Sequence, residues 1–255
     1  MASKYFTVEV KPTIAASLQN AAQFANGDVL FDWTSFQVPR GANKLVNVTA
    51  LVRPKGDAGP TGNPYPFQLV FSKSNTQSLG TVNGGTANRP SNDILGMVEF
   101  KAVDYMSAAV DSTQIADLSH GGANPVGPLV LQGDITTGDN VGYDTLHLGA
   151  VCQATSMDFI SINAIAEDTD AEHANSKVIT MDGTGMDVRE HFIAGDILHI
   201  GTSEGTPAAD SLIGTVESAD STTQITLEAV SPTALVDGDL LYNIHPIRFI
   251  LQFER

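Results

Sequence analysis

Cysteine is nearly absent from this sequence. Cys152 is the only cysteine among the 255 residues, so no intrachain disulfide and no cysteine-based metal site can form. It lies in the apolar stretch LGAVCQATSM, and no histidine-containing motif marks it as a nucleophile. A buried, unreactive thiol is the expectation, and a scaffold held together by disulfides is excluded.

Positive charge is also scarce. The chain has 13 Lys plus Arg against 29 Asp plus Glu, a formal net charge of −16 and a sequence pI near 4.5. Such a surface repels phosphate backbones and anionic lipids, so we expect neither nucleic acid nor a membrane as a partner. The first residues, MASKYFTVEVKP, contain no apolar signal core, and no run approaches the roughly 20 apolar residues of a membrane span. We expect synthesis in a cytosol.

Motifs that carry chemistry are missing as well. Neither of the glycine-rich phosphate-binding patterns occurs, nor does a Gly-x-Ser-x-Gly nucleophile turn. No two of the six histidines have metal-ligand spacing. The acidic stretch EDTDAEH offers Asp168, Asp170 and Glu172 as weak candidates for a divalent cation, but it lacks the glycine turn and the closing glutamate of a calcium loop. We therefore expect no catalytic residue, no cofactor and no metal site.

Strand-like segments fill the chain instead. About fourteen runs are rich in Val, Ile, Phe and Thr and end at Gly, Pro or Asn; YFTVEV, KLVNVTALV, PFQLVFSK and IRFILQFE are examples. Helical pattern is weak and confined to IAASLQNAAQFA and MDVREHF. The sequence predicts an all-β protein whose main domain is a jelly-roll-like β-sandwich.

A change of texture predicts a second domain. After the polar stretch AEDTDAEHANSK the strands become short and evenly spaced, which favours a small five- or six-stranded β-barrel over residues 177–243. The last segment, IHPIRFILQFER, resembles NPYPFQLVFSKS near the start of the chain rather than its neighbours. We infer that it returns to the first domain, so that residues 1–173 and 244–255 form the sandwich and the barrel is inserted.

A small-Gly-Asp step recurs before strand-like runs, in NGDVLFDW, AGDILHIG and DGDLLYNI. Glycine tolerates positive φ, and an aspartate can accept hydrogen bonds from nearby backbone. We interpret the pair as turn chemistry rather than as an active-site signature.

Two long loops, residues 53–66 and 75–93, are the expected contact surfaces, because ordered loops on a β-scaffold commonly bind partners. The candidate interaction residues in them are Arg53, Lys55, Asp57, Pro60, Asn63, Tyr65, Asn83, Asn88 and Arg89. Trp33, Tyr143 and Tyr242 would serve a sugar-binding platform if exposed, although the apolar neighbours of Trp33 favour a place in the core.

The stretches FQVPRGANKLVNVTALVRPKGDAGPTGNPYPFQLVFSKS and AGDILHIGTSEGTPAADSLIGTVESADSTTQITLEA resemble structural proteins of tailed bacteriophage virions. The resemblance implies a non-enzymatic accessory protein, most concretely a capsid decoration (cement) protein that forms a homo-oligomer and binds the major capsid protein of a head assembled in the bacterial cytoplasm. It carries no functional residues with it. A tail or baseplate component is the near alternative, and a carbohydrate- or receptor-binding module that contacts a host-surface glycan is the alternative from another class.

Overall fold

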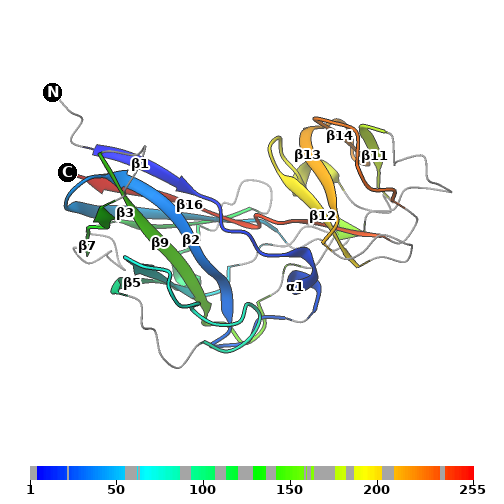
Figure 1. The fold of residues 1–255 in the computed structure, drawn as a ribbon. Coiled ribbons are helices and arrows are strands. Elements are labelled where there is room, and N and C mark those ends of the chain that lie inside the picture. The colour runs from blue at the N-terminus through cyan, green and yellow to red at the C-terminus, as the bar shows by residue number, and fades with distance from the viewer. Residues whose placement is uncertain are drawn as a thin grey trace.

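The computed structural model describes residues 5–21, 23–54, 62, 64–86, 93–106, 113–119, 129–135, 142–157, 159, 162–163, 176–181, 187–202, 210–235 and 239–255. These residues form three antiparallel sheets and a few short helical segments (Figure 1). The prediction of a mostly β protein is confirmed. No helix in the described part of the chain is both long and apolar enough to cross a bilayer.

Two of the sheets face each other and form what we call the main body. The first sheet has the order β1 (Tyr5–Val10), β16 (Ile247–Glu254), β3 (Asn43–Val52), β6 (Gln114–Ser119), with β7 (Leu129–Leu131) also on β3. The second sheet has the order β2 (Val29–Pro39), β9 (Tyr143–Cys152), β4 (Phe67–Ser72), β5 (Ile94–Phe100), with β8 (Asp134–Ile135) also on β9.

One hydrophobic core fills the space between these two sheets. Phe249 from the first sheet lies 5.8 Å from Phe31 and 5.9 Å from Phe67 of the second, measured between ring centroids. Phe67 in turn stacks on Phe100 at 4.8 Å. All four rings are fully buried, and burying an aromatic side chain contributes on the order of 2–3 kcal/mol. These aromatic contacts hold the two sheets face to face.

The last strand lies inside the first sheet. β16 pairs along its whole length with β3 on one side and, from Phe249 to Glu254, with β1 on the other. Its residues alternate strictly between buried and half-buried, with Ile247, Phe249, Leu251 and Phe253 facing the core, which is the period of a strand with one covered face. The final segment thus pairs with strands from the beginning of the chain.

The third sheet, which we call the module, has the order β10 (Ile162–Asn163), β15 (Leu240–Asn243), β12 (Ile197–Thr202), β13 (Leu212–Ala219), β14 (Gln224–Leu227), β11 (Val178–Thr180). It encloses a separate core of residues such as Ile200, Ile213 and Leu227. β13 and β14 form the hairpin expected from the sequence. β10 comes from before residue 177, so the sheet begins earlier in the chain than expected.

The strand pairing of the module corrects the expectation of a closed barrel. Among the described residues β10 and β11 are the two edge strands and do not pair with each other, so the sheet is open. The strand register shifts at Leu198/His199, Ile200/Thr202 and Val216/Ser218, and such bulges bend strands. Bending wraps the sheet around its core, but closure additionally requires the edge strands to meet at a matching stagger.

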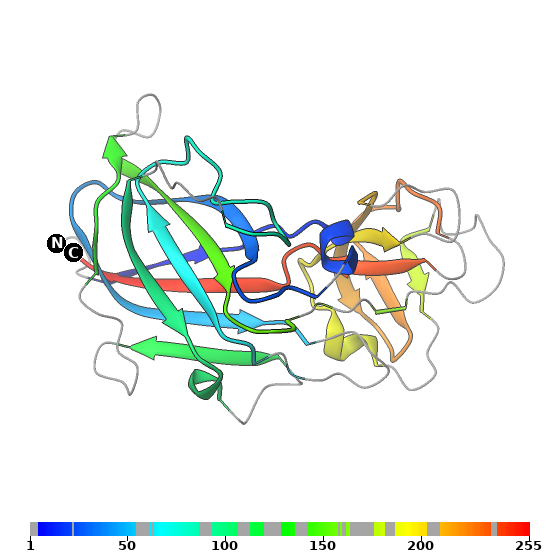
Figure 2. The same cartoon turned by 90° about the horizontal axis from the view of Figure 1, so that it is seen from below.

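The module lies at the end of the main body opposite to the chain termini (Figures 1 and 2). The short helix α1 (Ala16–Ala21) follows β1 and packs against β12 and β15 of the module. Within the module, α2 (Val188–His191) begins at Asp187, whose side chain accepts a hydrogen bond from the Arg189 backbone N–H. The 3₁₀ turn η1 (Ala102–Asp104) follows β5. Both stretches with helical pattern are thus helical, but only over one or two turns.

Candidate functional site: the junction between main body and module

The junction is built on the turn that leads into β12. Gly195 has φ +88°, and the Asp196 N–H donates to the Ile193 carbonyl (3.1 Å). The Asp196 carboxylate accepts from the Ile193 N–H (3.0 Å) and so closes the turn a second time. The turn then pairs with β13, because the Gly195 N–H donates to the Val216 carbonyl and the Val216 N–H donates to the Asp196 carbonyl, each at 2.8 Å.

The turn before β2 uses the same device. Gly27 has φ +94°, and Asp28 makes both the backbone bond to the Ala25 carbonyl (3.1 Å) and the carboxylate bond to the Ala25 N–H (2.7 Å). The backbone of Cys152 plays the part of Val216: its carbonyl accepts from the Gly27 N–H and its N–H donates to the Asp28 carbonyl. The interpretation of Gly-Asp as turn chemistry is confirmed at these two positions; Gly238 lies outside the described residues.

The Asp196 carboxylate has a cation opposite it, and no ion pair of Asp28 occurs within the described part of the chain. Arg53, which follows β3 in the main body, forms an ion pair with the Asp196 carboxylate at 3.3 Å. The same Arg53 nitrogen, Nη2, donates to the His191 carbonyl at the end of α2, and the Arg53 backbone N–H donates to the Pro246 carbonyl (2.9 Å). Arg53 therefore links β3 to the module and to the segment before β16.

This ion pair is largely out of water, since the Arg53 and Asp196 side chains are only 15% and 12% exposed. Burial lowers the pKa of Arg53, although Asp196 opposes the shift. Burial likewise raises the pKa of Asp196, against the effect of Arg53. In both groups desolvation outweighs the attraction, so the pair depends on each partner being present.

The N-terminal segment holds the other side of the junction. The Gln19 amide nitrogen of α1 donates to the Asn243 carbonyl of β15 (2.9 Å) and to the Ile14 carbonyl (2.7 Å). The Ser17 N–H donates to the Asp210 carboxylate (2.9 Å). Because Gln19 is buried, these bonds are shielded from competition with water. Two sets of polar contacts, around α1 and around Arg53, therefore fix the module to the main body.

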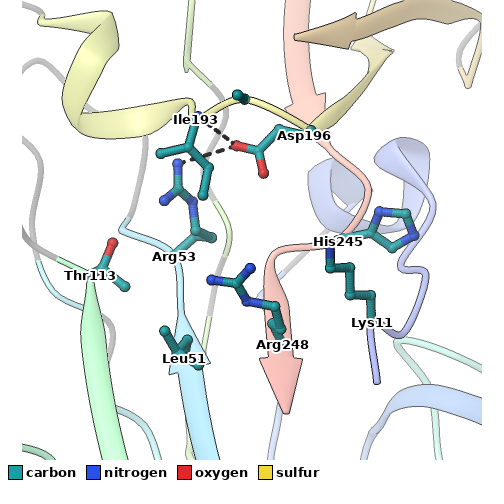
Figure 3. Close-up of a pocket in the computed structure, with 10 residues that line it drawn as sticks. Lys11, Leu51, Arg53, Thr113, Ile193, Asp196, His245 and Arg248 are labelled. Carbon is teal, nitrogen blue, oxygen red and sulfur yellow. Dashed lines mark hydrogen bonds and ion pairs between the residues drawn. The ribbon is translucent and has the colours of Figure 1, made fainter. Parts of the chain in front are cut away.

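A small pocket lies between these contacts (Figure 3). Lys11 after β1, Arg53 after β3 and Arg248 on β16 line it from the main body. Asp196 lines it from the module, and His245 from the connection between β15 and β16. Figure 3 shows Arg53 and Arg248 extending from adjacent strands toward the 193–196 turn. Burial, followed by the nearby Lys11, lowers the pKa of His245.

Only three of the predicted contact residues fall within the described structure. Arg53 is engaged inside the chain, as described above, so we assign it to the junction. Tyr65 packs against the main core, and its carbonyl accepts from the Tyr105 hydroxyl (2.8 Å). Asn83 adopts φ +54° and donates to the Leu18 carbonyl (3.0 Å). The other six lie outside the described residues: Lys55, Asp57, Pro60, Asn63, Asn88 and Arg89. The contact role of the loops stays a prediction.

The described part of the second loop, residues 75–86, folds back on the second sheet. The Trp33 indole N–H donates to the Gln77 carbonyl (2.8 Å), and the Leu79 N–H donates to the Asp32 carboxylate (2.8 Å). Leu79 is buried in a small cluster with Val29 and Val151, against which Trp33 packs. Trp33 is therefore partly buried beneath this loop and packs against the small cluster, whereas its apolar neighbours in the sequence favoured a place in the core.

An apolar rim remains exposed at the β5 edge of the second sheet. β5 pairs only with β4 among the described strands. Met97 on β5 is 62% exposed and Val103, shortly after the strand, is 86% exposed; Ile94 at the start of β5 and Met106 after it are also exposed. Exposed apolar side chains on and near an edge strand can mark an interaction site. We call these four residues the β5 rim. The sequence does not distinguish them, because apolar residues in a strand-like run predict a place in the hydrophobic core.

Two titratable side chains outside the junction, Cys152 and His147, are buried in the main body. Cys152 is buried and free, and burial raises its pKa, as expected for an unreactive thiol. His147 is buried beside the Ser35 hydroxyl (3.0 Å), and burial lowers its pKa. Within the described residues no three His, Cys, Asp or Glu side chains gather as a metal site would require. Asp168, Asp170 and Glu172 lie outside that part of the chain.

No family model matches the chain, and a search of curated proteins finds no match. Function must therefore be argued from the arrangement of the chain itself.

Proposed function

We propose that the chain is a non-enzymatic structural protein of a tailed bacteriophage virion, most concretely a decoration protein that binds the major capsid protein on an assembled head. The observation that carries the proposal is the strand order of the main body. Strands β1, β2, β3 and β4 alternate between the first and the second sheet. β5 then lies beside β4 in the second sheet and β6 lies beside β3 in the first. β9 pairs with β2 and β4 in the second sheet, and β16 pairs with β1 and β3 in the first. The rows β1-β16-β3-β6 and β2-β9-β4-β5 agree with the strand order expected of an eight-stranded jelly roll, and we infer that the main body has this architecture, which viral capsid and lectin domains use.

The jelly-roll strand order supports both a virion role and a sugar-binding role, because one fold serves several functions. Of the three aromatic side chains considered for a sugar platform, Trp33 lies under the 75–86 loop and Tyr242 is buried, whereas Tyr143 is exposed. A stacking platform usually needs an accessible ring face. Tyr143 is therefore the observation that keeps a carbohydrate- or receptor-binding module as the second candidate; a tail or baseplate position is a variant of the first.

The β5 rim is the surface that we propose for contact with the capsid. An edge strand can pair with a strand of another chain, and exposed methionine adapts to the surface it meets. Attachment at several points, through a homo-oligomer or through neighbouring capsid subunits, would make modest single contacts sufficient. Such a protein stabilises the head by adding buried area where subunits meet.

The test is sedimentation of the purified protein with emptied, expanded heads that lack it. We expect binding at a fixed number of copies per head, and at least about tenfold weaker binding for Met97→Lys, because a charge would be desolvated in an apolar contact. Val230→Lys is the matched control, since Val230 is similarly exposed but lies in the module. Absence of co-sedimentation would refute decoration, and glycan binding abolished by Tyr143→Ala would favour the second candidate.

We also propose that residues 177–243 form an inserted domain. The separate core of the module and the return of β16 to the first sheet support this division. Joining residue 176 to residue 244 through a short linker should leave a soluble main body that unfolds cooperatively. An insoluble product, or one without a cooperative transition, would contradict an independent main body.

A further inference from the structure

The junction pocket gathers positive charge in a strongly acidic protein. Lys11, Arg53 and Arg248 line it, and these are three of only 13 basic residues in a chain of net charge −16. Two carboxylates adjoin them: Asp196 pairs with Arg53, and Glu9 lies 3.1 Å from Arg248 and 3.8 Å from Lys11. Three positive charges against two negative ones leave a local excess of one positive charge. A concave site with low-dielectric walls focuses that charge on an entering anion.

Donor groups are available in the pocket. Arg53 uses Nη2 for Asp196 and for the His191 carbonyl, while its Nε is buried and donates to no described group. A buried N–H without an acceptor is unfavourable, and an entering anion would supply that acceptor. Arg248 and Lys11 share the single carboxylate of Glu9, and the hydroxyl of Thr113 lines the same space. Burial and, less strongly, the like charge of Arg248 lower the pKa of Arg53, against the opposing effect of Asp196.

The size of the pocket limits what can enter. It encloses about 50 Å³, whereas one water needs roughly 10–15 Å³ on this scale and small-molecule sites typically offer about 300–1,000 Å³. A sugar ring or a nucleotide is too large. A tetrahedral oxyanion fits, and guanidinium groups bind such oxygens through parallel hydrogen bonds. We propose that the junction pocket binds one small inorganic oxyanion of the phosphate or sulfate class, with Arg53, Arg248 and Lys11 as its ligands.

Binding there would connect parts of the chain that are far apart in sequence. Arg248 lies on β16 and Arg53 directly follows the adjacent strand β3, whereas the 193–196 turn belongs to the module. An anion between them offsets the repulsion of the two guanidinium groups and strengthens the junction. Because it binds the folded state, it also raises the unfolding temperature. The site is independent of the virion role proposed above.

The test is calorimetric titration of the full chain with sodium sulfate and with sodium phosphate, at low ionic strength, against sodium chloride of equal ionic strength. We expect saturable binding of one oxyanion per chain and a higher unfolding temperature with sulfate than with chloride. Lys11→Met should weaken binding about tenfold, the effect of one charge-assisted hydrogen bond. Arg248→Gln should weaken it at least as much, and its unfolding transition shows whether it is folded.

Lys101→Met is the matched control. Lys101 and Glu99 are two residues apart at the end of β5, as Lys11 and Glu9 are at the end of β1. Their side chains are similarly exposed, 50% and 46% against 44% and 47%, but Lys101 does not line the pocket. Unchanged affinity in Lys101→Met supports the site. Equal weakening in both lysine variants, the same heat with chloride, saturable binding of acetate but not of sulfate, or no saturable binding would each overturn it.

Discussion

Replacing Arg53 by methionine should destabilise the protein more than any other charge-removing substitution that we consider. Methionine preserves the apolar stem of Arg53 and removes its charge, which leaves Asp196, a carboxylate only 12% exposed, without its cation. Removing one partner of a buried ion pair costs roughly 3–5 kcal/mol. Both side chains retain some contact with water, so we expect the lower end, about 3 kcal/mol of unfolding free energy. The loss should shrink at acidic pH, because burial raises the pKa of Asp196 and the unpaired carboxyl then takes up a proton.

A double-mutant cycle separates the ion pair from the other contacts of Arg53. Asp196→Asn retains an oxygen that can accept from Ile193, so we expect a smaller loss of about 1–2 kcal/mol. The double variant Arg53→Met/Asp196→Asn should cost less than the sum of the two single variants, with a coupling energy of at least about 1 kcal/mol. This sign follows because the second substitution removes the charge that the first leaves unpaired.

Urea unfolding with two probes is the assay. Trp33 is the only tryptophan and lies on β2, so its fluorescence reports the main body, whereas far-ultraviolet circular dichroism reports both parts. Weakening the junction should separate the two transitions. Lys101→Met, which breaks an exposed pair, should stay within about 1 kcal/mol of the unmodified protein. A cost below about 0.5 kcal/mol for Arg53→Met, or strictly additive costs in the cycle, would refute the assignment of the pair as the main polar contact of the junction.

The remaining predictions concern the turns, one histidine and the thiol. Gly27→Ala and Gly195→Ala should each cost about 1–2 kcal/mol, because an alanine there is forced to positive φ with no steric clash otherwise; Gly85→Ala, which has the same open surroundings without positive φ, should be near neutral in the same urea assay. Burial lowers the pKa of His147, so the unfolded chain binds a proton at this histidine more readily than the folded chain. The stability that neutral His147 contributes is therefore complete above about pH 6.5 and is lost as the pH falls toward the lower pKa of the folded state. Between pH 7.5 and pH 5.5, His147→Gln should lose less stability than the unmodified protein, and an equal loss would contradict this reasoning. Cys152 should react with a thiol reagent only under unfolding conditions, and fast reaction of the native protein would show that it is not buried.

Secondary structure was predictable here because it rests on local patterns. The alternation of residues 247–254 reports one covered face whatever the partner strands are. The return of that segment to the first sheet was also predictable, since it resembles PFQLVFSK in texture more than the short strands around it. The open edge of the module was not predictable, because closure depends on strand stagger and on the bulges near His199 and Ser218, and neither is written in the period of the apolar residues.

The junction illustrates a different limit. Arg53 and Asp196 are 143 residues apart, and each has a satisfactory local reading: Arg53 as the start of a proline- and glycine-rich loop, and Asp196 as a turn residue. Neither segment contains a pattern that indicates contact with the other, so the sequence favoured Arg53 as a residue that contacts a partner. The only usable signal was composition, because few basic residues exist in the chain, and the place where several of them converge could be identified only after the fold brought the strands together.

The two Gly-Asp turns show how a site arises from a repeated local device. At residues 27–28 and 195–196 the glycine conformation, the aspartate bonds to the backbone and the pairing with the opposite strand are the same. What differs is the surroundings of the carboxylate. At Asp196 the packing of the module against β3 places Arg53 opposite, and β16 adds Arg248. The turn motif therefore predicts the backbone geometry wherever it occurs. Whether a copy contributes to a binding site depends on whether the tertiary fold places a cation beside its carboxylate. In a chain with so few basic residues, the positions of those residues indicate a site better than the recurring motif does.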